Sequence, residues 1–146
     1  MIDESFITTY ITSTFENVKT TFNLGYTFFI YRDDDMLPFA TIASTGNKYE
    51  QLSRLDRPDV FRLNIGVSRE TFQALIGTDK PNISAYDFTA LDKFLPHPDY
   101  SAQFFICVLS PSEATFERIK PLLAEAYDIA VKKYTQRKTH RKTNIK

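Results

Sequence analysis

The residues of this chain that could do chemistry gather in one strand-like stretch and in a loop that follows it. Arg62 and Asn64 alternate with apolar residues over positions 60–67. A guanidinium beside an amide is suited to binding a carboxylate or a phosphate. His97 lies between two prolines, in a constrained loop of the kind that often carries a site. The candidate ligand-binding residues are Arg57, Arg62, Asn64, Asp87 and His97.

The same polar residues also have a structural interpretation. The arginines can pair with nearby carboxylates and so fix the loops against a sheet, and His97 can lock its own loop by bonding to the backbone. The aspartates available for such pairs are Asp56, Asp87 and Asp92. At the level of the sequence, a binding site and a structural network both stay open.

His97 allows a catalytic interpretation too, because an imidazole can act as a general base or bind a metal. A zinc site is not expected, since the chain has two histidines and one cysteine, and His140 falls in a basic tail that we expect to be exposed. The four glycines supply neither a P-loop nor a dinucleotide fingerprint. We therefore expect no metal and no cofactor, and rank a hydrolase centred on His97 third among the functions considered.

The single cysteine and a run of three aspartates carry weaker signals. Cys107 lies in the apolar run 104–109 and is expected to be buried and unreactive, because an apolar environment disfavours the thiolate. Asp33, Asp34 and Asp35 offer the oxygen ligands that hard cations prefer, but three adjacent carboxylates in a hairpin cannot all converge on one ion. We expect them to form a solvated turn.

Charge is distributed unevenly along the chain. Residues 1–131 contain 18 acidic and 11 basic residues, a net charge of −7, whereas residues 132–146 contain seven basic residues and no acidic one. Such a tail can bind nucleic acid by neutralising phosphates, although cations also favour the C-terminal end of a helix. Nucleic-acid binding is the second function considered. The tail residues concerned are Lys132, Lys133, Arg137, Lys138, Arg141 and Lys142.

Length and composition indicate one folded domain. The chain has 146 residues, of which 42% are hydrophobic, enough for a core of ordinary size. We expect a domain over residues 1–134 and a flexible basic tail over residues 135–146. The first residues lack the features of a signal peptide, and no apolar segment approaches the roughly 20 residues that span a bilayer. A soluble cytoplasmic protein without membrane contact is expected.

The hydrophobic patterns predict an α+β fold. Positions 60–67 alternate strictly, which is typical of a half-buried strand in an antiparallel sheet. A helix over 69–76 should follow, begun by Ser68 and ended by Gly77. Further strands are expected over 26–32, 37–43 and 103–109. Terminal helices should begin near Asp3 and after Ser112 or Thr115, with an irregular or extended link over 20–25 and a short helix over 88–95.

These elements predict a compact two-layer sandwich, in which a β-meander and one further strand form the sheet and the terminal helices pack on it. The runs 55–58, 60–67, 86–92, 96–98 and 121–127 resemble an uncharacterised bacterial domain family of unknown function. The resemblance covers residues 26–134, and more distantly the chain is similar to the MmcQ/YjbR-like domains, which implies the same fold. The function expected first is a non-catalytic binding or interaction domain for a small anionic molecule or a protein partner.

Overall fold

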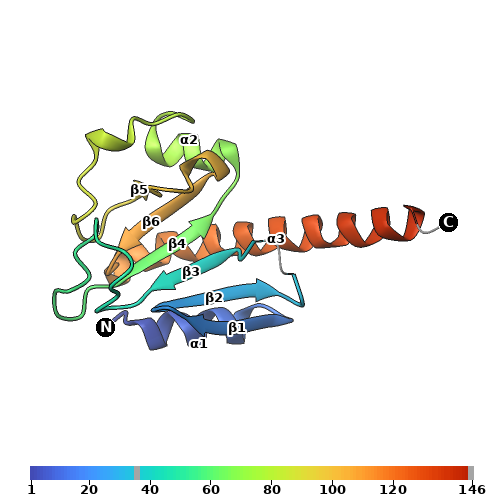
Figure 1. The fold of residues 1–146 in the computed structure, drawn as a ribbon, viewed down its shortest axis with the longest axis horizontal. Helices are drawn as coiled ribbons and strands as arrows, with labels where there is room; N and C mark the ends of the chain where they lie inside the picture. The colour runs from blue at the N-terminus through green and yellow to red at the C-terminus, as the bar shows by residue number, and fades with distance from the viewer. Residues whose placement is uncertain (35–36, 145–146) are drawn as a thin grey trace.

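The structure of the chain, a computed structural model, describes residues 1–34 and 37–144. Its centre is a six-stranded antiparallel sheet with the strand order β1-β2-β3-β4-β6-β5 (Figure 1). The strands are β1 (Val18–Asn23), β2 (Tyr26–Tyr31), β3 (Ala40–Ala43), β4 (Arg62–Gly66), β5 (Leu95–Pro96) and β6 (Phe105–Leu109). The helices are α1 (Glu4–Thr14), α2 (Arg69–Ile76) and α3 (Glu113–Asn144), with short 3-10 turns η1 (Ile83–Ala85) and η2 (Ser101–Gln103). The predicted α+β class is confirmed.

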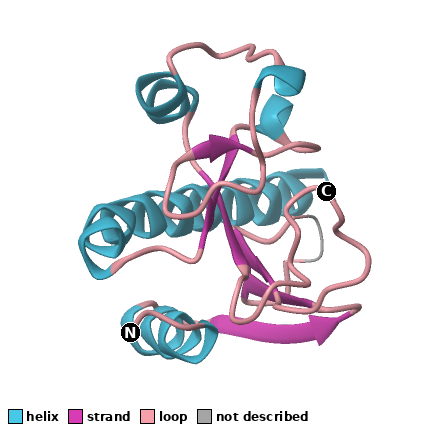
Figure 2. Ribbon diagram, turned by 90° about the vertical axis from the view of Figure 1, so that its left-hand side faces the viewer, coloured by secondary structure: helices cyan, strands magenta, loops and turns pink. Residues whose placement is uncertain are grey.

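One face of the sheet packs against the terminal helices. The alternating residues of the β4 region, from Phe61 to Val67, lie in the main core together with Ile7 of α1 and Ile119 of α3. Figure 2 shows α1, next to the N label, and the beginning of the long helix α3 on one side of the strands and the long loops on the other. The alternation in the sequence therefore correctly identified the apolar face of the central strand.

The opposite face of the sheet is covered by loops, which corrects the prediction of a half-buried strand. Arg62 and Asn64 point to this loop face, yet each is only 1% exposed. Leu55, from the loop over 44–61, packs against the β3–β4–β6 part of this face, and Phe88, from the loop over 77–94, packs against its β5–β6 part. Both faces of β4 are buried because these loops fold back over the sheet.

The predicted helix ends are confirmed by their capping bonds. The Asp3 carboxylate accepts the N–H of Phe6 at 2.8 Å, and Ser68 Oγ accepts the N–H of Thr71 at 3.1 Å. Ser112 Oγ caps α3 in the same way. α2 ends at Gly77, whose φ of 99° lies in the left-handed region that glycine adopts without strain.

Two predicted segments differ from the structure: the short helix was wrong, and the link, which was predicted as irregular or extended, is a paired strand. The link over 20–25 is largely strand β1, which pairs along its whole length with β2. The short helix over 88–95 does not form. Asp87 instead holds a turn by accepting the N–H of Thr89 at 3.0 Å, and Leu95 and Pro96 pair with β6 as β5. Pairing overrides the weak local preference in both places, for β1 with β2, the next strand along the chain, and for β5 with β6.

The aspartate turn is also corrected, because two of its carboxylates bind α3. Tyr134 donates its hydroxyl to Asp33 at 2.6 Å, and Arg137 lies 2.5 Å from the Asp34 carboxylate. Asp34 is 7% exposed, so this turn is not simply solvated. Asp35 lies outside the described residues. α3 continues through Asn144, while the division into residues 1–134 and a flexible tail stays a prediction. None of the described helices has the length and apolar character needed to cross a membrane.

Candidate functional site

A pocket of about 400 Å³ on the loop face brings together three of the five predicted ligand-binding residues. Arg62 and Asn64 reach it from β4, and His97 reaches it from the loop that follows β5. The strand period of two places Arg62 and Asn64 on the same face. β6 pairs with both β4 and β5, and so carries His97 to the side of the same pocket.

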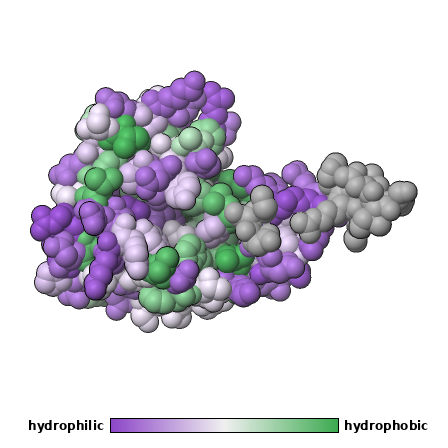
Figure 3. Space-filling model, viewed as in Figure 1, coloured by the Kyte–Doolittle hydropathy of each residue, from purple (hydrophilic) through white to green (hydrophobic). Residues whose placement is uncertain are grey.

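Apolar and aromatic side chains form the rest of this pocket. They come from β2, from the loops on either side and from the start of β6, and include Leu24, Tyr26, Phe28, Tyr49, Tyr100 and Phe105. Tyr49 and Tyr100 are 67% and 50% exposed at its rim. Figure 3, which views the molecule from the loop side, shows apolar side chains among hydrophilic ones over the strands. Apolar walls around a few polar groups are typical of small-molecule sites.

Phe105 forms part of the pocket wall because the residue of β4 that faces its ring, Gly66, has no side chain. Gly66 pairs with Phe105 across the two strands, and a Cβ atom at Gly66 would meet the ring of Phe105 at 2.8 Å. Such a distance is too short for a carbon–carbon contact. The glycine therefore allows the ring of Phe105 to pack closely against β4.

The guanidinium of Arg62 is held by a buried polar network. Its Nε donates to Asn64 Oδ1 at 2.9 Å, and its Nη1 donates to Ser53 Oγ at 3.0 Å. The same Nη1 lies 3.1 Å from Glu50 Oε1, and the Glu50 side chain is only 7% exposed. Asn64 in turn donates to Thr41 Oγ1 at 2.9 Å. Arg62 is thus paired and oriented before any ligand arrives.

The loop over 44–57 presents Glu50 to Arg62 through a buried asparagine. Asn47 donates to the carbonyl of Gly25 at 2.8 Å, and its Oδ1 accepts the N–H groups of Tyr49 and Glu50. Glu50 then accepts the N–H of Ser53 at 2.8 Å. Each of these bonds satisfies a backbone group that a covering loop must otherwise leave unpaired. The loop is therefore ordered by the same residues that fix the ion pair.

The hydrogen bonds of His97 define its protonation state. Its Nδ1 accepts the N–H groups of Asp99 and Tyr100, at 3.0 and 3.1 Å. A ring nitrogen that accepts carries no proton, so the proton of the neutral imidazole lies on Nε2. Burial, reinforced by the positive charge of Arg62, lowers the pKa of His97 to about 3. The predicted backbone lock is thus observed, and Nε2 is a donor.

Two of the site's donor nitrogens have no acceptor within the described parts of the chain, namely Nη2 of Arg62 and Nε2 of His97. Both residues line the pocket, and no described side-chain nitrogen is sealed from solvent without a partner. These two nitrogens therefore reach the space of the pocket. Burial also raises the pKa of Tyr26, which keeps this neighbouring hydroxyl neutral. The pocket offers hydrogen-bond donors to an acceptor on a ligand.

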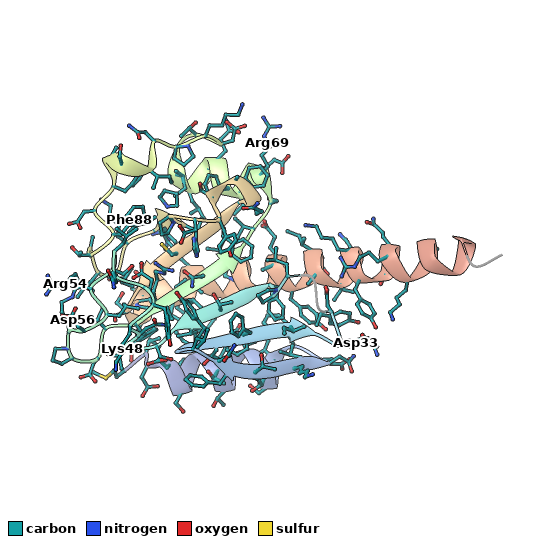
Figure 4. The ribbon with its side chains drawn as sticks, viewed as in Figure 1. Asp33, Lys48, Arg54, Asp56, Arg69 and Phe88 are labelled. Carbon is teal, nitrogen blue, oxygen red and sulfur yellow. The ribbon has the colours of Figure 1, made fainter. Side chains whose placement is uncertain are left out.

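The other two predicted ligand-binding residues, Arg57 and Asp87, form hydrogen bonds within the covering loops. Arg57 donates to the carbonyls of Ser53 and Thr89, both at 2.9 Å, and so ties the two covering loops together. Asp87 is occupied by its own turn. The exposed pair Arg54–Asp56 points outward from the loop, away from the strands (Figure 4). Neither Arg57 nor Asp87 lines the pocket.

The predicted nucleic-acid residues lie on the second half of α3. Two of them form ion pairs within the chain, Lys132 with Asp128 at 3.8 Å and Arg137 with Asp34. Figure 4 shows Asp33, the neighbour of Asp34, beside this helix. Lys133 and Arg137 line a second pocket of about 260 Å³, and Lys138 lies over the ring of Tyr134. Arg141 and Lys142 lie outside the side chains that the structure describes.

Cys107 is buried in β6, as predicted, and burial raises its pKa to about 12. The thiol is therefore protonated at neutral pH and unsuited to act as a nucleophile. Within residues 1–34 and 37–144 no three His, Cys, Asp or Glu side chains are grouped as a metal site.

Several residues of the pocket network were missed from the sequence. They are Thr41, Glu50, Ser53, Tyr49 and Tyr100. Glu50 is the most important, and only a physical argument could have found it. A buried arginine requires a carboxylate, but the sequence offers many carboxylates and nothing local that selects Glu50.

Comparison with known proteins identifies one family. Residues 2–139 match DUF6194, a family of unknown function. No curated protein and no solved structure matches the chain. Because the match covers almost the whole chain, the chain belongs to this family, in agreement with the expectation of an uncharacterised domain.

Proposed function

We propose that this member of the DUF6194 family is a non-catalytic domain that binds a small organic molecule in the pocket over β4. The observation that carries the proposal is the convergence of Arg62 and Asn64, from β4, and His97, from the loop after β5, on one pocket of about 400 Å³. Pockets of about 300–1,000 Å³ hold typical small ligands. The likeness to MmcQ/YjbR-like domains stays a prediction and carries no part of this proposal.

The way in which the pocket is built supports a binding role. A buried arginine–glutamate pair usually contributes less stability than apolar residues of the same volume, so folding alone does not require Arg62 and Glu50. Exposed aromatic rings at the rim are likewise unfavourable in water. A ligand that covers Tyr49 and Tyr100 and accepts from the donors beneath them would account for both features.

The state of His97 supports binding over hydrolysis. A general base needs an unprotonated nitrogen that faces the substrate. In His97 the unprotonated Nδ1 is occupied by two backbone N–H groups, and the protonated Nε2 faces the pocket. His97 is therefore arranged to donate a hydrogen bond to a ligand.

Truncation of the rim should weaken ligand binding without unfolding the protein. We expect Tyr49→Ala and Tyr100→Ala each to weaken any pocket ligand about tenfold, because a lost aromatic contact is worth about 1–1.5 kcal/mol. A fragment library screened by protein-observed NMR would supply the ligands, and titration would give the affinities. Phe22→Ala is the matched control, since Phe22 is 69% exposed on β1 and does not line the pocket.

Two results would count against the proposal. One is a screen in which no fragment shifts the signals of pocket residues. The other is a set of fragments whose affinities fall as much in Phe22→Ala as in the two tyrosine variants.

Nucleic-acid binding through α3 is the second candidate. It is favoured by the continuation of α3 through Asn144, since Figure 1 shows this end of the helix extending beyond the sheet. The segment 132–146 carries seven basic residues and no acidic one. A basic helix that protrudes from an acidic body can approach phosphates without bringing the acidic residues close.

The test for this candidate compares two variants that each lose four positive charges. We expect the full chain to retard duplex DNA at low salt, and replacement of Lys133, Lys138, Arg141 and Lys142 by Gln to abolish the retardation. The matched control replaces the exposed body residues Lys19, Lys48, Lys80 and Lys93 by Gln. Equal retardation by the two variants would contradict a role for α3.

A further inference from the structure

We propose that the pocket over β4 selects an uncharged ligand, with a carbonyl-type acceptor as its polar head and an apolar or aromatic body. This inference rests on the proposed binding function and specifies its ligand class. The sequence had favoured an anion, because it shows Arg62 without its partner. The contacts around Arg62 change that expectation.

The charge of Arg62 is already balanced inside the protein. Glu50 lies 3.1 Å from the guanidinium, and both side chains are almost wholly buried. An anion entering the pocket would gain attraction from Arg62 but meet repulsion from Glu50 nearby. Asp99 lines the pocket itself and adds a further negative charge. The pocket as a whole therefore offers no net positive charge, and a carboxylate would lose its hydration without compensation.

The donors nevertheless remain available to a neutral acceptor. Nη2 of Arg62 and Nε2–H of His97 reach the pocket, since the remaining bonds of these two side chains go to Asn64, Ser53 and the loop backbone. The amide of Asn64 is itself engaged by Thr41. A carbonyl oxygen has two lone pairs and can accept from two donors at once. An amide, lactam or ketone satisfies this arrangement without bringing charge into the pocket.

The walls define the rest of the ligand. Phe28 and Phe105 have no polar atom in their side chains, and Tyr49 and Tyr100 present their rings at the rim. A cationic head is disfavoured on the inner side, because the two available groups there are donors. We therefore expect the ligand to place its carbonyl next to β4 and its apolar body toward Tyr49 and Tyr100.

A matched probe series tests the inference on the unmodified protein. Aryl and alkyl carboxamides, the corresponding carboxylates and the corresponding amines would be titrated at pH 7 by protein-observed NMR. We expect each carboxamide to bind at least tenfold more tightly than its carboxylate and its amine. Carboxamide affinity should stay constant from pH 5.5 to 8. Tighter binding of the carboxylates would overturn the inference and leave the proposed function standing, whereas binding of none of the three classes would overturn both.

A charge variant gives a second, independent measurement. Glu50→Gln keeps the size of the side chain and one of its two acceptor oxygens, but removes the negative charge and so leaves Arg62 uncompensated. We expect the ratio of carboxylate to carboxamide affinity to rise at least tenfold in this variant. Asp56→Asn removes a carboxylate that lies outside the pocket and is the control. An unchanged ratio in folded Glu50→Gln would show that Glu50 does not set the preference, and would overturn the inference.

Discussion

Replacing Arg62 by Met should lower the free energy of unfolding by about 3–5 kcal/mol, because removal of one partner leaves a buried, uncompensated charge. The charge in question is Glu50, whose side chain is 7% exposed and lies 3.1 Å from the guanidinium. The variant also removes the donor to Ser53 Oγ, at 3.0 Å, from a buried site. Urea denaturation, monitored by circular dichroism, would measure the loss.

A double-mutant cycle separates the ion pair from the packing of the arginine. Removing the carboxylate as well, in Arg62→Met with Glu50→Leu, should recover much of the loss, since a buried pair replaced by apolar residues is often neutral or stabilising. Arg54→Ala is the control, because the Arg54–Asp56 pair is exposed and such pairs contribute about 0.2–1 kcal/mol. If the two single losses simply add in the double variant, Arg62 and Glu50 are not coupled as described.

The fold was predictable where one local pattern controls one element. The strict alternation around β4 determines which residues enter the main core. Ser68 and Gly77 mark α2 because the backbone groups at a helix end must be satisfied. The long apolar stripe of α3 likewise needs no distant partner to be read as a helix. In each case the residues that determine the element lie inside it or directly next to it.

The missed features depend on pairing partners, some of them in the next strand and others far along the chain. β1 is rich in threonine and has a weak pattern, and becomes a strand because β2 pairs with each of its residues. Asp34 lies in a turn that looks solvated until Arg137 reaches it from about 100 positions along the chain. In the sequence Glu50 looks like an ordinary loop carboxylate, and only the structure shows that it is buried against Arg62. The sequence contains these residues but not the distances between them.

The candidate site, like the fold, was predictable only where the signal in the sequence is local. Arg62 and Asn64 share a face by strand geometry alone, and the prolines around His97 indicate a constrained loop. These local signals identified three pocket residues. The expected anionic ligand followed from Arg62 without Glu50, and this long-range partner is the reason that we propose an uncharged ligand instead.

His97 should make the protein markedly less stable in mild acid. Its pKa is about 3 in the folded protein and near 6.5 when the imidazole is free in solution. Between these values the unfolded chain binds a proton that the folded chain does not, so stability is complete above pH 6.5 and falls as the pH decreases toward 3. The expected loss between pH 8 and 4.5 is about 2–3 kcal/mol, at a limiting slope of about 1.4 kcal/mol per pH unit.

The variant that isolates this effect is His97→Asn. The side-chain oxygen of asparagine can accept backbone N–H groups two and three residues ahead, as Nδ1 of His97 does, but it does not titrate. We expect the acid-induced loss between pH 8 and 4.5 to shrink by about 2–3 kcal/mol in this variant, measured by urea denaturation at each pH. The other histidine, His140, which the sequence places in the basic tail, provides the control His140→Asn.

Asp56 and Asp87, two carboxylates with a lowered pKa, titrate below this pH window. Hydrogen bonds from Arg54 and from Thr89 hold the pKa of Asp56 and of Asp87 below the usual 3.8. Their contribution to stability is therefore lost only as the pH falls below about 3.8. The difference between the wild type and His97→Asn over pH 6.5 to 4.5 therefore reports on His97. A steep loss of stability that persists there in His97→Asn would contradict a neutral His97. It would also contradict the role of Nδ1 as the acceptor of two backbone N–H groups, because both nitrogens of a charged imidazole carry protons.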